Sequence, residues 1–324
     1  MPSIWEKEHK LKRWVKKNQK KLFDFNFDFD LMDIKSDPLL YYLSKNLNIE
    51  NNYIYTSAGI SQLINSILTL PRWTNIYIIK NEFALYERTL DIYEKKKKII
   101  NEGNFESLIK FFKNYKSLDT DLFCFSSPRW YNGVNITIKE LEELQYYFKG
   151  NIIIDEAYFD YSNNLNGFIN YCLENDNIIL FRSFSKKFFM PGLRVGYMIT
   201  KVHFDHIRDT IIPPHSISTL SSRLAVSLLR DAKLLNYFNN INKYIINCRK
   251  YLYKNLNIKY KECTIYNSES NFLTIQFRSI VNYMKFYMKI KDFPGIQCFE
   301  EKKFIKIWIT NMDICQKIVN AIND

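Results

Sequence analysis

The sequence predicts an α/β fold in which a mostly parallel sheet has helices on both faces, followed by a smaller α+β domain. Between residues 51 and 200, short apolar runs alternate with helical patterns. After residue 214, a long helical stretch is followed by short strands and a last helix. Continuous apolar strands separated by helices are typical of parallel sheets that are buried on both faces. We therefore expect a large domain over 36–210, and a small domain formed by 211–324 with an N-terminal arm, 1–35.

The period of the apolar residues predicts the elements in order. In the large domain, strands are expected at 53–56, 76–79, 122–125, 152–154, 178–181 and 195–199. Helices are expected at 61–70, 84–94, 105–115 and 138–148. In the small domain, we expect a long helical stretch over 219–252, strands at 271–276 and 304–309, and a terminal helix from residue 312.

Composition excludes several classes of protein. The 324 residues are 47% hydrophobic, which is typical of a globular chain. The six cysteines are scattered without a CxxC pair, so we expect neither a metal site nor a disulfide framework. No apolar run approaches membrane-spanning length, and the first residues are charged. We expect a cytoplasmic protein without a membrane partner.

The net charge of +12 raises the question of an acidic partner. Positive charge is dense over residues 7–21 and 95–98. The first run also carries apolar residues at helical spacing, so we interpret it as an amphipathic arm that packs on the body or on a second subunit. Because no groove-reading motif accompanies the charge, we do not expect nucleic acid as a partner.

Two segments place reactive groups just after predicted strands, where ligands of open α/β sheets bind. Asp155 ends the strand at 152–154, and Tyr158 follows it. Such a carboxylate could keep a pyridinium nitrogen protonated, or it could simply cap a turn. Lys186 lies in a segment rich in hydroxyl and cationic groups after the strand at 178–181. A lysine there could form an imine, although a solvated basic loop is the alternative.

Together these segments resemble the signature of the class I/II aminotransferases. Ser-Phe-Ser-Lys at 183–186 is followed by Pro-Gly-Leu-Arg-Val-Gly-Tyr at 191–197, and Asp-Glu-Ala-Tyr stands at 155–158. Histidinol-phosphate aminotransferases and threonine-phosphate decarboxylases are the most similar groups, from about residue 39 to the C-terminus. The resemblance implies fold type I with a seven-stranded sheet, a homodimer, and pyridoxal 5′-phosphate (PLP) as the cofactor.

The resemblance also implies roles for individual residues. Lys186 would hold PLP as a Schiff base; its neighbour Lys187 is the rival but breaks the spacing to Arg194. The implied contacts with the cofactor are Asp155 to the pyridine nitrogen, Tyr158 to the phenolic oxygen, and Ser183 and Arg194 to the phosphate. Ser185, directly before the lysine, is a further candidate for cofactor binding.

Two weaker segments complete the predicted cofactor site. The turn at 56–62 resembles the family's phosphate turn, which makes the amides of Ile60 and Ser61 candidate donors at a helix N-terminus. A plain turn with a serine cap explains the same residues. Phe83 falls where the family stacks an aromatic ring on the pyridine, and a core phenylalanine is the alternative.

Three positions depart from the family's pattern. Trp130 stands where an asparagine contacts the phenolic oxygen, so Tyr158 would act alone or Asn132 would reach in. Lys306 replaces the arginine for the substrate carboxylate, and Arg129 could compensate. Near Phe299, histidinol-phosphate aminotransferases carry an arginine for the substrate phosphate, which argues against that substrate.

The resemblance predicts an aminotransferase that moves an amino group from an amino acid or amino compound to a 2-oxo acid. The altered carboxylate and asparagine positions keep an amino-acid decarboxylase or another α/β-carbon lyase as an alternative. A catalytically inactive partner subunit with the same fold is a further one.

Overall fold

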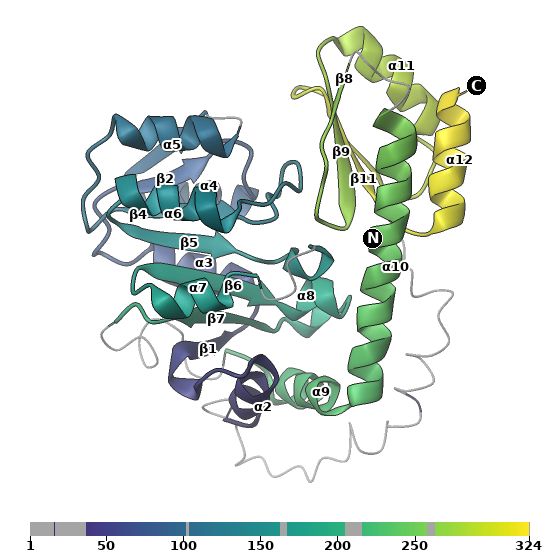
Figure 1. The fold of residues 1–324 in the computed structure, drawn as a ribbon. Coiled ribbons are helices and arrows are strands. Elements are labelled where there is room, and N and C mark those ends of the chain that lie inside the picture. Colours follow the sequence, from purple (N-terminus) through teal and green to yellow (C-terminus); the bar gives the residue numbers. More distant parts are fainter. Residues whose placement is uncertain are drawn as a thin grey trace.

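The computed structural model describes residue 16 and residues 37–101, 104–162, 167–204, 216–257 and 263–323 (Figure 1). Apart from residue 16, the predicted arm lies outside these ranges, as does the junction near residue 211. The arm and the domain boundaries therefore stay predictions.

The large sheet has seven strands in the order β1-β7-β6-β5-β4-β2-β3. They are β1 (Ile54–Ser57), β2 (Ile76–Ile79), β3 (Lys97–Ile100), β4 (Leu122–Ser126), β5 (Asn151–Asp155), β6 (Ile178–Ser183) and β7 (Gly196–Thr200). Strands β3, β2, β4, β5 and β6 run parallel, whereas β7 is antiparallel to both β6 and β1. The predicted α/β class and the mostly parallel seven-stranded sheet are confirmed.

Helices cover both faces of this sheet because alternate residues of each strand point to opposite sides. Phe123 and Phe125 of β4 pack with α5 (Phe105–Lys113), α6 (Ile138–Tyr147) and α7 (Ile169–Glu174). The intervening Cys124 packs on the other face with α3 (Ile60–Leu68) and α4 (Ala84–Ile92). This burial on both sides explains why the strands read as continuous apolar runs.

The second sheet is antiparallel and has the order β10-β11-β9-β8. Its strands are β8 (Cys263–Ile265), β9 (Phe272–Phe277), β10 (Ile296–Phe299) and β11 (Phe304–Trp308). The helices of this region are α9 (Thr219–Arg230), α10 (Ala232–Asn257), α11 (Ile280–Ile290) and α12 (Met312–Asn323). The long helix α10 runs from the side of the large sheet up to the small one (Figure 1).

The long helical stretch predicted over 219–252 consists of two helices, because the chain breaks between α9 and α10. Asp231 has extended backbone angles (φ −91°, ψ 95°), and its carboxylate accepts the N–H of Leu234 at 3.0 Å. An aspartate at this position caps the new helix, which compensates for the lost backbone bonds.

Other elements escaped the sequence patterns. Strand β3 comes from the lysine-rich run at 95–98; it is an edge strand, so Lys97 can pair with Glu87 and Asp91 at the surface. Helix α2 (Asp37–Leu47) packs beside α9 (Figure 1). Strands β8 and β10, helices α7 and α11, and the short helices α8 (Phe184–Lys187), η2 (Asn51–Tyr53), η3 (Phe159–Tyr161) and η4 (Pro191–Leu193) were also not predicted.

Candidate functional site

The fold brings the predicted residues together at the carboxyl ends of β4, β5 and β6. Asp155 is the last residue of β5 and lies beside Ser126 of β4 and Phe181 of β6. Helix α8, which carries Lys186, starts directly after β6. Ser126 and Lys186, which are 60 residues apart in the chain, thus converge with Asp155 at one edge of the sheet, where this class of fold binds ligands.

The Asp155 carboxylate is buried, and both of its oxygens accept hydrogen bonds. Its Oδ2 accepts the hydroxyl of Tyr86 at 3.1 Å, and its Oδ1 accepts the N–H of Ala157 at 3.0 Å. Burial raises the pKa of Asp155 to about 7, and the nearby charge of Glu82 also raises it. Sequence reasoning missed Tyr86, although its position three residues after Phe83 on α4 was a usable signal. The site therefore holds a carboxylate that a cationic group would stabilise in its ionised form.

Lys186 lies on α8, close enough to this carboxylate for the charge of Asp155 to act on its amine. Its Nζ lies 5.1 Å from the ring centre of Tyr158 and 5.6 Å from that of Trp308. Within the described ranges, it forms no hydrogen bond or ion pair. Burial lowers the pKa of Lys186, while the charge of Asp155 acts in the opposite direction. Its backbone carbonyl accepts the hydroxyl of Tyr161 at 2.9 Å, which fixes the turn of chain that carries the amine.

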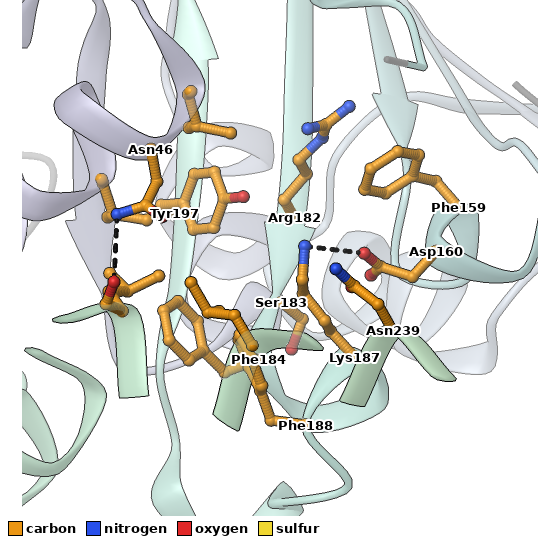
Figure 2. Close-up of a pocket in the computed structure, with 14 residues that line it drawn as sticks. Asn46, Phe159, Asp160, Arg182, Ser183, Phe184, Lys187, Phe188, Tyr197 and Asn239 are labelled. Carbon is orange, nitrogen blue, oxygen red and sulfur yellow. Dashed lines mark hydrogen bonds and ion pairs between the residues drawn. The ribbon is translucent and has the colours of Figure 1, made fainter. Parts of the chain in front are cut away.

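The adjacent Lys187 points elsewhere. Figure 2 shows it in a separate pocket of about 220 Å³, where its Nζ lies 3.1 Å from Asp160. Arg182 and Tyr197 line the same pocket (Figure 2). The charge of Asp160 raises the pKa of Lys187, so this lysine is held as a cation. Of the two neighbouring lysines, Lys186 is the one whose amine is influenced by the charge of Asp155.

A close approach between two turns forms the candidate phosphate site. Gly59 has φ +79° and precedes α3, and a Cβ at this position would lie 2.5 Å from Nη2 of Arg194. Gly196 packs against the backbone of Gly59, where a Cβ would lie 2.7 Å from its carbonyl carbon. The first amides of α3, those of Ile60 and Ser61, therefore lie beside the Arg194 guanidinium. Helix N-terminal amides and a guanidinium are a donor set that suits phosphate.

The other predicted cofactor residues border these groups. Ser183 caps α8, and its Oγ accepts the N–H of Ser185 at 3.0 Å. Phe83 precedes α4 and is 37% exposed, which is unusual for a phenylalanine and leaves its ring available to a ligand. Tyr158 is buried beside Phe272, with ring centres 5.6 Å apart. Their predicted contacts with the cofactor stay predictions.

Lys306, at the position of the family's arginine, lies fully buried on β11. Its Nζ donates to the carbonyl of Trp130 at 2.6 Å and lies 3.6 Å from the ring centre of Trp130 and 4.3 Å from that of Phe272. Burial lowers the pKa of Lys306 to about 7; the charge of Glu82 opposes this, and that of Lys186 adds to it. The side chain is therefore poised between its neutral and charged forms near neutral pH.

The remaining predicted substrate residues surround Lys306 less directly. The ring of Trp130 meets Phe299 edge-on at 5.9 Å. Asn132 uses its Oδ1 to accept the N–H of Val134 at 3.0 Å, within its own turn. Arg129 is buried, with its guanidinium carbon 6.0 Å from the ring centre of Phe105. The proposed substrate roles of these residues are not decided by this geometry.

A family model described as aminotransferase class I and II matches residues 6–320. The chain belongs to this family. Curated members that are similar to it include two histidinol-phosphate aminotransferases. The one from Methanococcus aeolicus is 26% identical over 258 residues, which is 78% of this chain and 68% of that protein. The one from Caldanaerobacter subterraneus is 23% identical over 306 residues, which is 90% and 83% of the two chains.

Solved structures of aminotransferases and of a decarboxylase share the fold. The histidinol-phosphate aminotransferase from Clostridium acetobutylicum superimposes with a TM-score of 0.74 at 19% identity, covering 96% of this chain and 94% of that one. The L-threonine-O-3-phosphate decarboxylase from Porphyromonas gingivalis gives 0.73 at 16% identity, with coverage of 98% and 97%. Family membership makes the chain an enzyme of the aminotransferase class, and the fold is that of fold-type I enzymes.

The residues present fit PLP, the cofactor that the resemblance implies. The Gly59 turn leaves the space that a Cβ would fill beside Arg194, as a phosphate requires. The buried Asp155 suits a protonated ring nitrogen, and the Lys186 amine has no competing partner among the described side chains. These three groups come from separate elements, so their convergence is a property of the fold.

Proposed function

We propose that this protein is a PLP-dependent aminotransferase that uses Lys186 to carry the cofactor. The observation that carries the proposal is the position of the Lys186 amine, which lies beside Tyr158 and within the influence of the Asp155 charge, while Lys187 is paired with Asp160. Bound at this site, PLP supplies an electron sink for the bonds at the substrate's α-carbon.

The chain's own residues have distinct tasks in this proposal. Arg194 and the α3 amides bind the phosphate, and Asp155 holds a proton on the ring nitrogen through its negative charge. Tyr158 lies within reach of Lys186 and orients the ring. The depressed pKa of Lys186 increases the fraction of neutral amine, which can then take a proton from the substrate's α-carbon and return it.

The proposed donor is an amino acid whose acid group faces Lys306. Similarity to histidinol-phosphate aminotransferases supports an amino substrate, and a role in biosynthesis is the corresponding proposal. Phe299 stacks on Phe304 with ring centres 4.2 Å apart, so an apolar wall stands where those enzymes would place an arginine. We therefore propose a substrate other than histidinol phosphate.

The assembly and location are proposals as well. We propose a cytoplasmic homodimer, in line with the family, and do not propose nucleic acid as a partner. None of the described helices is both long and apolar enough to cross a lipid bilayer. Sedimentation of the purified protein, with and without short RNA at low salt, tests the dimer and the absence of nucleic-acid binding together.

Borohydride reduction of the PLP-loaded protein tests the assignment of Lys186. Peptide mass spectrometry is expected to find the phosphopyridoxyl group on Lys186 in the native protein and in Lys187→Met. A label on Lys187 would contradict the residue assignment, and a protein that stays colourless with PLP would contradict the cofactor.

Mixing the loaded protein with a panel of amino acids decides the reaction. Formation of pyridoxamine phosphate together with a 2-oxo acid supports amino transfer. Release of carbon dioxide with the cofactor unchanged would instead indicate a decarboxylase, and bound cofactor with neither product would indicate an inactive partner subunit.

A further inference from the structure

Glu82 is a buried carboxylate that none of the proposed cofactor contacts uses. Its side chain lies in the loop between β2 and α4, and the residue is 8% exposed. Oε1 accepts the Ser126 hydroxyl at 2.5 Å and the N–H of Phe83 at 3.1 Å, while Oε2 accepts the N–H of Ser126 at 3.1 Å. Three donors, from the neighbouring loop and from β4, therefore fix the position of this carboxylate.

Hydrogen bonds lead from this carboxylate to Lys306. The Oγ of Ser126, which donates to Glu82, accepts the N–H of Trp130 at 2.6 Å. The carbonyl of Trp130 accepts from Nζ of Lys306 at 2.6 Å. This chain of hydrogen bonds runs from Glu82 through Ser126 and Trp130 to Lys306. It fixes the main chain of Trp130 and the ammonium of Lys306. The two ends are 224 residues apart in the sequence.

Charge links the same two residues. On β11, Lys306 faces Thr274 of β9 and Gln297 of β10 across the sheet, and neither side chain is ionisable. The charged groups that act on it are Glu82, which favours its protonated form, and Lys186, which opposes it. Aromatic rings occupy much of the remaining surroundings, so water contributes little to holding the charge.

We propose that Glu82 determines the substrate's acid-group preference, by keeping Lys306 protonated and by holding Trp130 where the Lys306 ammonium meets it. Glu82 is thus a positioning residue that acts through Ser126 and Trp130. This inference rests on the proposed function, in which Lys306 receives the substrate's acid group. It names Glu82 as the residue that allows a lysine to bind the acid group at a position where the family has an arginine, because an arginine stays charged without such support.

Calorimetric binding to the PLP-loaded protein tests the proposal. The probe is 3-phenylpropionate, which carries a carboxylate and a ring but no amino or oxo group, and its uncharged amide is the matched ligand. In Glu82→Gln, affinity for the acid is expected to fall about tenfold at pH 7.5, with the pH midpoint of binding about one unit lower. Affinity for the amide is expected to change little. Glu87→Gln, the same substitution on exposed α4, is the control and is expected to match the native protein.

Ser126→Ala separates position from charge, because it removes the hydroxyl that links Glu82 to Trp130 and keeps the Glu82 carboxylate in the chain. It is expected to weaken binding of the acid while the pH midpoint stays near the native value. Unchanged affinity and midpoint in Glu82→Gln would overturn the proposal. If that variant does not fold, unchanged acid binding in Ser126→Ala overturns it equally.

The same measurements separate this inference from the proposed function. If the native protein forms pyridoxamine phosphate, and both variants bind the acid as the native protein does, the proposed function stands and the role of Glu82 is refuted. If the native protein binds the acid and the amide equally well, the proposed role of Lys306 is refuted, and so is the inference about Glu82.

Discussion

At the scale of single residues, the candidate site depends on where individual charges are buried. Asp155 and Lys306 both titrate near neutral pH because burial opposes their charged forms. Lys187, by contrast, keeps its charge through Asp160. Lys187 and its neighbour Lys186 thus differ in chemistry because their side chains leave the backbone in different directions.

The raised pKa of Asp155 predicts how stability depends on pH. Without a cationic partner, the folded state binds a proton up to about pH 7, whereas the unfolded chain loses it near pH 4. Stability of the cofactor-free protein is therefore expected to fall from about pH 4 to pH 7, and Asp155→Asn is expected to remove this part of the decline. Thermal unfolding of both proteins over this range measures the difference. Curves that run parallel would show that Asp155 does not titrate as described.

At the scale of elements, the turn before α3 and the segment after η4 must approach closely to form a phosphate site. Gly59 makes this approach possible by its positive φ and its missing Cβ. Strand β7 returns antiparallel beside β6 and β1 and so brings Arg194 to the start of α3. These elements contribute to the candidate phosphate site through the residues at their ends, which are the first amides of α3 and Arg194 before β7.

Gly59→Ala is expected to weaken PLP binding by at least about tenfold, because the methyl group displaces the Arg194 guanidinium. The positive φ is expected to cost about 1 kcal/mol of stability as well. Fluorescence titration with PLP measures the affinity. Gly192→Ala is the matched control, since a Cβ there meets no atom within 4 Å. Equal losses in both variants would argue against the phosphate cradle.

At the scale of the whole molecule, α10 connects the two sheets (Figure 1). Arg249 on this helix is buried and donates through Nη1 to the carbonyls of Tyr161, at 3.0 Å, and Ser270, at 2.6 Å. Tyr161 in turn binds the carbonyl of Lys186. One side chain therefore couples the small-sheet region to the turn that carries the reactive amine.

Arg249→Met is expected to lower the free energy of unfolding by about 2–4 kcal/mol, because two buried carbonyls lose their donor. Urea unfolding measures this loss. Lys254→Met, on an exposed position of the same helix, is the control and is expected to stay within about 0.5 kcal/mol of the native protein. A loss of similar size in both would mean that the helix, and not the Arg249 contact, is responsible.

The fold class and the central motif can be predicted from the order of the residues alone. Apolar runs and helical periods depend on local spacing, so six of the seven strands of the large sheet were predicted close to their observed bounds. The order and spacing of Asp155, Lys186 and Arg194 likewise lie within one stretch of chain. The edge strand β3 escaped because two of its four residues are lysines, which interrupt the apolar pattern, and the break at Asp231 because one carboxylate ends one helix and starts the next.

The surroundings of the reactive amine, by contrast, become visible only in the folded protein. The hydrogen bond between Tyr86 and Asp155 spans 69 residues, and that between Lys306 and Trp130 spans 176. The separate directions of Lys186 and Lys187, and the burial of Glu82, are also invisible in the pattern of residues. Charges and hydrogen bonds depend on distances in space, and these are set by the packing of strands and helices that the sequence places far apart.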